Sequence, residues 1–267
     1  MIRNRVIPCL LLKGNGLVKT EKFKNPKYVG DPINAVKIFN TKEVDELIFL
    51  DTTAFKRNTP PNYQMIANIA TECFMPFCYG GGIRTLEEAK QILSIGAEKI
   101  SINSSALQNR GFITRLSEHI GRQSIVISMD IKKTLLGRYV VYSHTMQKAF
   151  TSHPVAFAKE MEASGAGEIL VNSVDRDGMM SGYDLKLIKM VADAVTIPVI
   201  ASGGAGDLSH FRQAVEAGAT AVAAGSMFVF IGKHLAVLIN YPAYEEITSL
   251  FNSNKAYSTL RGWEIRL

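Results

Sequence analysis

The stretch PFCYGGGIRTLEEAKQILSIGAEKISINSSA (76–106) is closely similar to PVIASGGAGDLSHFRQAVEAGATAVAAGSMF (198–228). Equivalent positions lie 122 residues apart, and the residues they share include Pro76/Pro198, Gly81/Gly203, Gly82/Gly204, Gly96/Gly218 and Ser104/Ser226. The same offset relates Glu46 to Glu168, so the repeat extends to ELIFLD and EILVNS. Self-similarity at a fixed period indicates that the chain consists of two equivalent halves.

Short runs of β-branched and aliphatic residues predict eight buried strands. The runs are RVIPCLLL (5–12), ELIFLD (46–51), MPFCYG (75–80), KISIN (99–103), SIVISMD (124–130), EILVNS (168–173), IPVIAS (197–202) and TAVAAG (220–225). Helical patterns lie between them, each ending in a glycine suited to a left-handed C-terminus, as in TLEEAKQILSIG (85–96), FAKEMEASG (157–165) and DLSHFRQAVEAG (207–218). Alternating strands and helices imply parallel strands, so four βα units repeated twice predict a (βα)8 TIM barrel of the α/β class.

The length of 267 residues and the hydrophobic content of 47% suit a single barrel domain spanning 1–267. Within it we expect half-barrels at about 1–120 and 121–240, with a divergent tail at about 232–267. A doubly wound open sheet is the structural alternative, although its halves rarely correspond this evenly.

Composition narrows the classes of function. No apolar run reaches the length of a membrane span, and the start MIRNRVIPCLLLK is a poor signal peptide, so we expect a cytoplasmic protein with no membrane partner. The 3 cysteines lack paired spacing, so neither disulfides nor a metal site is predicted, and no cofactor is expected. We expect no nucleic acid partner, because the charge is mixed and no helix-turn-helix, RNA-binding or zinc-finger signature occurs.

The segment KGNGLVKTEKFKNPKYVG (13–30) holds five lysines and one glutamate within a net charge of +6. Two interpretations stay open: a solvated surface loop, or an arm that attracts an anionic ligand. Lys19 lies in this segment and could close over an anionic substrate, although a solvated lysine is the commoner outcome.

Glycines just past two strands predict phosphate-binding sites, because they let backbone N–H groups approach an anion. Gly80–Gly82 and Gly203–Gly204 occupy equivalent barrel positions, and each set is followed one strand later by Asn103–Ser104 or Gly225–Ser226. Ordinary turns are the alternative. Sites related by half a turn of the barrel would face each other, which suits a ligand with a phosphate at each end, and the loop at Asp177–Gly178 would lie between them.

Reactive side chains of a barrel come from the C-terminal ends of its strands, where Asp51, Asp130 and Asp177 are expected. Asp51 could equally cap the next helix. Aligning VIPCLLLK (6–13) with IVISMDIK (125–132) sets Leu11 opposite Asp130, so Asp130 is the sole catalytic candidate of that pair. We assign none of the 5 histidines a role, although His144 follows the hairpin of the fifth strand.

Charged residues begin four of the predicted strands at the opposite rim, namely Arg5, Glu46, Lys99 and Glu168. Two cations and two anions pointing into one end of a barrel could form a closed ion-pair ring, which structural stability alone would explain.

The motifs VIPCL, DELIFLD, GGGI, KISIN, DRDG (175–178), SGYD (181–184) and IASGGAG resemble the cyclase subunit of imidazole glycerol phosphate synthase, the HisF family of histidine biosynthesis, over about residues 1–230. The resemblance implies a two-half barrel that takes ammonia from a HisH-like glutaminase on its N-terminal rim and cyclises a ribulosyl substrate with two phosphates. It implies catalysis by Asp130, a substrate role for Lys19, and an ammonia gate formed by Arg5, Glu46, Lys99 and Glu168. It also implies phosphate contacts at Gly82, Asn103, Ser104, Asp177, Gly178, Gly203, Gly204 and Ser226.

The chain departs from that family at Leu11, where a second catalytic aspartate is expected, at Asn172 in place of a threonine, and in the tail from about Gly232. IPCLLLK and the run at 18–40 resemble the WbuZ-type branch, which implies amidation of a surface-polysaccharide (O-antigen) sugar to an acetamidino sugar, with a further amidotransferase as partner. Three functions stay open: ammonia delivery for this amidation, the histidine-pathway cyclase, and a non-catalytic phosphate-binding scaffold.

Overall fold

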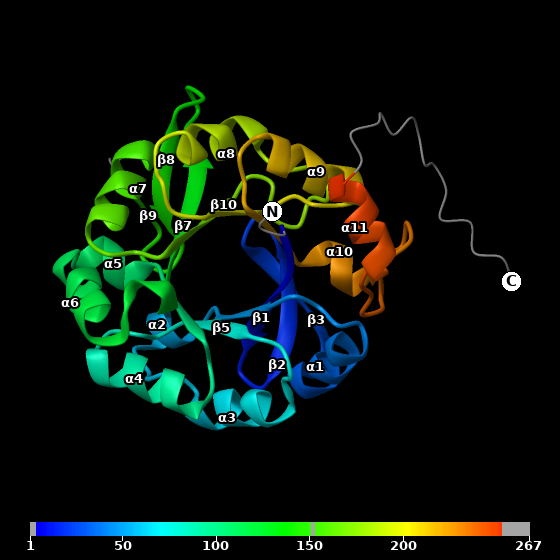
Figure 1. The fold of residues 1–267 in the computed structure, drawn as a ribbon, viewed down its shortest axis with the longest axis horizontal. Helices are drawn as coiled ribbons and strands as arrows, with labels where there is room; N and C mark the ends of the chain where they lie inside the picture. Colours follow the sequence, from blue (N-terminus) through cyan, green and yellow to red (C-terminus); the bar gives the residue numbers. More distant parts are fainter. Residues whose placement is uncertain (1–3, 151–152, 253–267) are drawn as a thin grey trace, which may run out of the picture.

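Eight parallel strands close into a barrel in the computed structural model, which describes residues 4–150 and 153–252 (Figure 1). In spatial order they are β1 (Arg5–Lys13), β4 (Leu47–Asp51), β5 (Phe77–Gly80), β6 (Lys99–Ile102), β7 (Ile125–Lys133), β10 (Glu168–Ser173), β11 (Val199–Ser202) and β12 (Ala221–Ala224). Pairing of Arg5 with Ala221 joins β1 to β12, and pairing of Asn172 with Asp130 joins β10 to β7. The eight parallel strands close on themselves without a free edge, so the predicted TIM barrel is confirmed and the open-sheet alternative is wrong.

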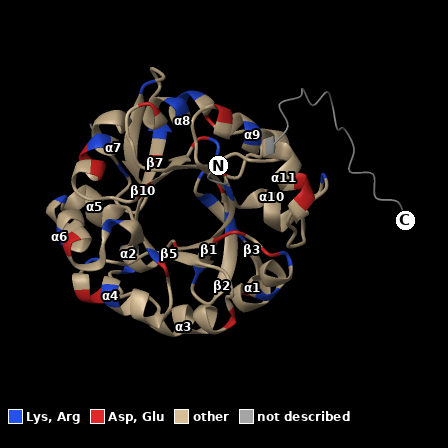
Figure 2. Cartoon of the chain, viewed as in Figure 1, with Lys and Arg blue, Asp and Glu red and all other residues tan. Residues whose placement is uncertain are grey.

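Helices surround the barrel, as Figure 1 shows. They are α1 (Pro32–Thr41), α2 (Ala54–Arg57), α3 (Tyr63–Glu72), α4 (Leu86–Ile95), α5 (Ser104–Gln108), α6 (Gly111–Ile120), α7 (Pro154–Ala163), α8 (Leu185–Ala192), α9 (Leu208–Glu216), α10 (Ser226–Val229) and α11 (Tyr244–Asn252), with a short 3-10 turn at Arg122–Ser124. Acidic and basic residues of both signs are interspersed over these outer helices (Figure 2).

The repeated βα unit owes its helix boundaries to local capping. At the start of α4, Thr85 accepts a hydrogen bond from the Glu88 backbone N–H while Glu88 accepts one from the Thr85 N–H. Such a capping box satisfies donors that the first helical turn leaves free. Gly96 ends the helix at φ 130°, a conformation that glycine adopts without strain. The equivalent helix α9 is capped by Asp207 and followed by Gly218 at φ 105°.

Apolar side chains fill both the barrel and the layer between strands and helices. Ile7, Val126, Leu170 and Ile200 are at most 1% exposed and pack inside the barrel with other strand residues. A larger cluster lies between the sheet and the helices. The interior is therefore a packed core through its middle, as is usual for this fold.

Antiparallel strands extend the barrel sheet after β1 and after β7, and a separate two-stranded hairpin follows α10. The basic segment 13–30 forms β2 (Gly16–Glu21) and β3 (Lys24–Gly30), and Leu11 of β1 pairs with Val18 of β2. The segment is therefore a hairpin rather than an irregular loop, and it remains largely solvated, because Lys13, Lys22, Lys24 and Lys27 are exposed and, of its lysines, only Lys19 is buried. The other hairpins involve β7, β8 (Tyr139–Ser143) and β9 (Lys148–Phe150), and β13 (Phe230–Ile231) with β14 (Ala236–Val237).

The segment after the last barrel strand packs back on the beginning of the chain. The Tyr241 hydroxyl donates to the Val6 carbonyl at 2.9 Å, and the ring contacts Phe39 and Phe228. The predicted divergent tail thus contributes a buried anchor to β1 before α11. Its final part, 253–267, lies outside the described residues.

Candidate active site at the C-terminal rim

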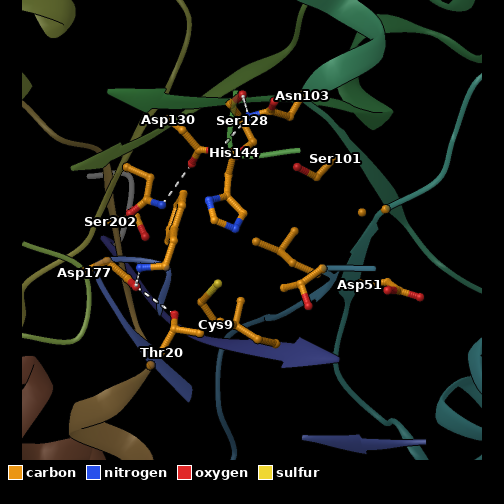
Figure 3. A pocket seen from close by; sticks show the side chains of 18 of the residues that line it. Cys9, Thr20, Asp51, Ser101, Asn103, Ser128, Asp130, His144, Asp177 and Ser202 are labelled. Atoms are coloured by element: carbon orange, nitrogen blue, oxygen red, sulfur yellow. Dashed lines mark hydrogen bonds between the residues drawn. The ribbon is translucent and has the colours of Figure 1, made fainter. Parts of the chain in front are cut away.

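A cavity of about 450 Å³ opens at the C-terminal ends of the barrel strands (Figure 3). Every residue predicted to bind substrate or to act in catalysis lines it, although they come from seven separate stretches of sequence. These residues are Lys19, Gly82, Asn103, Ser104, Asp130, Asp177, Gly178, Gly203, Gly204 and Ser226. The structure therefore places the two predicted phosphate sites and the predicted catalytic carboxylate around one space.

The first predicted phosphate site requires glycine for close backbone packing. Gly81 has φ 124°, and a Cβ added to it would lie 2.5 Å from the Asp51 carbonyl oxygen. Gly82 has φ 77°, and a Cβ there would lie 2.9 Å from the Ala54 side chain. Nearby, the Ser104 hydroxyl forms a 2.8 Å hydrogen bond with the Thr145 hydroxyl. The site is thus built from bare backbone and hydroxyl groups.

The second predicted site has equivalent glycines on the opposite side of the barrel. Gly203 and Gly204 have φ values of 84° and 116°, and a Cβ on Gly204 would lie 2.2 Å from the Gly182 carbonyl oxygen. Lys19 supplies a cation here, because its ammonium would lie 2.0 Å from a Cβ added to Gly225. The Lys19 side chain is only 6% exposed. The basic segment therefore directs one of its lysines inward, which favours the anion-attracting interpretation.

Asp130 projects into the cavity from β7 between two amide side chains. Asn172 donates from Nδ2 to Oδ1 of Asp130 at 3.0 Å, and Asn103 donates from Nδ2 to Oδ2 at 3.0 Å. Burial raises the pKa of Asp130 to about 7, since it disfavours the charged form more than the amide of Asn172 stabilises it, and the nearby Asp177 carboxylate raises the pKa further. A carboxyl group with a pKa near neutrality suits general acid–base catalysis.

The other carboxylates have structural partners. Asp51 accepts hydrogen bonds from the Thr53 and Ala54 backbone N–H groups at 2.8 and 3.1 Å, so its capping role is the one the structure shows.

Leu11 lines the cavity from β1, which is four strands from β7 in the closed barrel. The predicted opposition of Leu11 and Asp130 is therefore correct in its geometry.

The hairpin of β2 and β3 rests on the turn after β10. The Thr20 hydroxyl donates to Oδ2 of Asp177 at 2.9 Å, and the Lys22 N–H donates to the Asp177 carbonyl at 2.9 Å. Gly178 must be glycine here, because a Cβ would lie 2.1 Å from the Thr20 carbonyl oxygen. Asp177 and Gly178 thus hold the hairpin beside the cavity.

The four predicted gate residues form a closed ion-pair ring at the other rim. Arg5 contacts Glu46 and Glu168, and Lys99 contacts the same two carboxylates at 3.1 Å each. Burial disfavours the charged form of Arg5, but Glu168 and Glu46 outweigh it and raise its pKa. Oε2 of Glu168 is buried and has no hydrogen-bond partner among the described residues. The ring itself is observed, and its gating role stays a prediction.

Sequence reasoning missed several residues of the cavity. His144 and Thr145 reach it from the turn between β8 and β9, and the His144 ring packs edge-on against Phe23 at 5.3 Å. The sequence marks Asn172 only as a departure from the family pattern. The hairpin pattern after β7 was the signal available for His144, but it does not reveal that the turn folds back over the barrel mouth.

Within residues 4–150 and 153–252, no cluster of three or more histidine, cysteine or acidic side chains could hold a metal ion. None of the helices in these ranges is long and apolar enough to cross a membrane.

Comparison with known proteins places the chain in a family. Residues 5–234 match the family described as histidine biosynthesis protein. A protein of Pseudomonas aeruginosa named "Putative imidazole glycerol phosphate synthase subunit hisF2" is 54% identical over 91% of this chain and 97% of its own length. A Leptospira borgpetersenii protein named "Putative imidazole glycerol phosphate synthase subunit HisF" is 48% identical over 94% of this chain and 100% of its own length.

The imidazole glycerol phosphate synthase subunit HisF of Streptomyces coelicolor is 42% identical over 85% of this chain and 90% of its own length. The family match at residues 5–234 covers the barrel strands, the cavity and the ion-pair ring together. The chain therefore belongs to the HisF family.

Proposed function

We propose that this chain is a HisF-type synthase subunit that receives ammonia at its N-terminal rim and transfers it to a phosphorylated substrate at its C-terminal rim. The observation that carries the proposal is the single cavity in which two glycine-built anion sites flank Asp130. A ligand with a phosphate at each end would span the sites on β5–β6 and β11–β12, which lie on opposite sides of the barrel.

The partner in this proposal is a HisH-like glutaminase docked on the N-terminal rim. The relatives are named as subunits of imidazole glycerol phosphate synthase, which supports a multi-subunit assembly. The ring of Arg5, Glu46, Lys99 and Glu168 would act as the ammonia gate. The unpartnered Oε2 of Glu168 supports this role, because a buried acceptor without a partner can bind an incoming N–H donor.

The roles within the cavity follow from the chemistry of each group. Asp130 would act as general acid and base. Lys19 would pair with the phosphate held by Gly203, Gly204 and Ser226. Gly82, Asn103 and Ser104 would hold the other phosphate, while Asp177 and Gly178 would keep the hairpin closed over the ligand.

For the reaction itself we favour amidation of a surface-polysaccharide (O-antigen) sugar to an acetamidino sugar, with a further amidotransferase as partner. Leu11 supports this assignment, because leucine cannot exchange a proton and the cavity then offers Asp130 alone on the β1–β7 axis. Loss of one member of an acid–base pair costs about 10² to 10⁴ in rate. A primary biosynthetic cyclase would tolerate such a loss poorly.

The second candidate is the cyclase of histidine biosynthesis. The names of the relatives and the retained carboxyl group of Asp130 favour it. In that case another group would have to perform the step that Leu11 cannot.

The test is to reconstitute the chain with its glutaminase and to supply glutamine and the ribulosyl bis-phosphate substrate. Cyclisation at a rate typical of enzymes, about 1 s⁻¹ or faster, would contradict the amidation assignment. Formation of an amidated sugar only when this chain, the glutaminase and the further amidotransferase are all present would support it. A chain that neither binds the glutaminase nor stimulates it would instead be a scaffold.

A further inference from the structure

Asn172 lies beside Asp130 in the barrel wall. The parallel pairing of β10 with β7 sets the two residues directly opposite each other, and the pairing of β10 with β11 sets Asn172 opposite Ser202. Side chains at paired positions point to the same face of a sheet. Both residues line the cavity, so the Asn172 amide meets the Asp130 carboxylate there.

The two amides divide the carboxylate between them. Asn172 donates to Oδ1 and Asn103 donates to Oδ2, each at 3.0 Å, and the Nδ2 of Asn103 also contacts the Ser128 carbonyl at 2.9 Å. One fixed donor on each oxygen prevents the carboxylate from rotating freely about χ2. The remaining acceptor positions are left for the cavity.

The far end of the Asn172 side chain is fixed as well. A Cβ added to Gly203 would lie 2.7 Å from Oδ1 of Asn172, so this amide oxygen packs on the bare glycine backbone. Asn172 is thus held between the carboxyl group of Asp130 and the glycines of the second anion site. A threonine has no carboxamide and its side chain has one heavy atom fewer, so it could not contact both groups in this way.

We propose that Asn172 is a positioning residue that holds the Asp130 carboxylate in one orientation toward the substrate, so that this single group can both accept and donate the proton. The proposal rests on the proposed function for its catalytic consequence, but the orientation and the proton affinity of Asp130 can be measured without substrate.

Other titratable groups border the same cavity and define the electrostatic setting. They are Cys9 and Lys13 on β1, Lys19 on β2, Asp51 at the end of β4, His144 after β8 and Asp177 after β10. Burial raises the pKa of Cys9 to about 11, so this thiol stays neutral at pH 7. Asp177 raises the pKa of Asp130, whereas the hydrogen bonds from Asn172 and Asn103 lower it. Removing the Asn172 donor should therefore raise the pKa of Asp130.

The experiment follows the carboxyl carbon of Asp130 by NMR in full-length protein labelled with ¹³C-aspartate, with the signal assigned from Asp130→Asn. Asn172→Leu keeps the approximate shape and removes the donor, and Asn172→Thr keeps a shorter donor. We expect the midpoint to rise by about one pH unit in Asn172→Leu, because a hydrogen bond to a charged group stabilises it by about that amount. The midpoint in Asn172→Thr should lie between those of the wild type and Asn172→Leu. Ser202→Ala is the matched control, since Ser202 is the other register partner of Asn172 and makes no hydrogen bond to Asp130.

Equal titration midpoints in the wild type and in both Asn172 variants would overturn the proposal. If Asn172→Leu does not fold, as judged by its far-UV spectrum and thermal transition, the midpoint of Asn172→Thr decides. In the reconstituted reaction, the acidic limb of the kcat/KM profile should shift in the same direction as the NMR midpoint. A shifted midpoint in a chain that turns over no substrate would support the positioning role and contradict only the proposed function.

Discussion

The two ends of the barrel handle buried charge in opposite ways. At the N-terminal end, the carboxylates of Glu46 and Glu168 are compensated by the cations of Arg5 and Lys99. At the C-terminal end, Asp130 is held by neutral amides, and no cation of the described residues lies within ion-pair distance of it. Dipoles stabilise a carboxylate less than a full charge does.

This difference explains why the C-terminal end is the one suited to proton transfer. Direct ion pairs favour the charged form of a carboxylate, whereas burial with only neutral donors brings the pKa of Asp130 to about 7. The same barrel therefore keeps fixed charges at one rim and a titratable group at the other.

Replacing Asp130 should have the largest effect on turnover. In Asp130→Asn we expect the ammonia-dependent rate to fall about 10³-fold, because the group that transfers the proton is lost. The measurement is kcat with ammonium as the nitrogen source, which bypasses the glutaminase. Asp51→Asn is the control, since Asp51 borders the same cavity but caps the backbone at Thr53 and Ala54. Comparable losses in both variants would refute the special role of Asp130.

Breaking the ring should cost stability rather than proton transfer. Lys99→Met leaves two largely buried carboxylates sharing Arg5, and we expect a loss of about 3 kcal/mol in the free energy of unfolding. Denaturant unfolding measures this value. Arg110→Met removes an exposed pair with Glu160 and should cost less than about 1 kcal/mol. A similar small cost in both variants would mean that the ring is not a compensated buried cluster.

Restoring a carboxyl group on β1 should make the C-terminal end more like a two-carboxylate centre. In Leu11→Asp we expect cyclisation of the ribulosyl bis-phosphate to rise about 10²-fold, the contribution of one added acid or base. Leu11→Asn is the control, because it is polar but transfers no proton at neutral pH. A gain in both variants would assign the effect to polarity, and no gain in either would show that Leu11 alone does not limit cyclisation.

The pH dependence of stability should reveal the half-buried Asp130 directly. The pKa of Asp130 is about 7 in the folded chain and about 3.9 in the unfolded chain. The stability that Asp130 contributes is therefore fully present below about pH 4 and is lost as the pH rises through about 7. We expect the free energy of unfolding to fall by about 1 to 4 kcal/mol across this window relative to Asp130→Asn. Urea titrations at several pH values measure this difference, and parallel curves for the two proteins would contradict it.

Much of the fold could be predicted from the sequence because the repeat consists of glycines and apolar runs at matching positions. The 122-residue offset relates residues whose backbone conformations match, such as Gly81 and Gly203 with positive φ. The ion-pair ring could be anticipated because Arg5, Glu46, Lys99 and Glu168 all stand at the N-terminal ends of strands, and Glu46 and Glu168 are equivalent positions of the repeat. These features depend on local pattern and on barrel geometry, which are both periodic.

The rest depended on contacts that have no local signature. Nothing around Thr20 predicts that it meets Asp177, because the contact depends on how a hairpin leans over the mouth of the barrel. His144 lies in a turn whose direction is fixed by β8 and β9 together. Asn172 and Asp130 become neighbours only once β10 pairs with β7, so the hydrogen bond from Asn172 to Asp130 follows from the closed topology.

The hydrogen bond from Tyr241 to the Val6 carbonyl has a consequence for biosynthesis. During translation β1 emerges before the other barrel strands, yet one of its neighbours, β12, and the tyrosine that anchors it come more than two hundred residues later. Until then one edge of β1 presents unpaired backbone groups, which are a template for association with other chains. A ribosome-bound fragment that ends before residue 221 should therefore depend on chaperones, and release of the segment that contains β12 and Tyr241 should end that dependence.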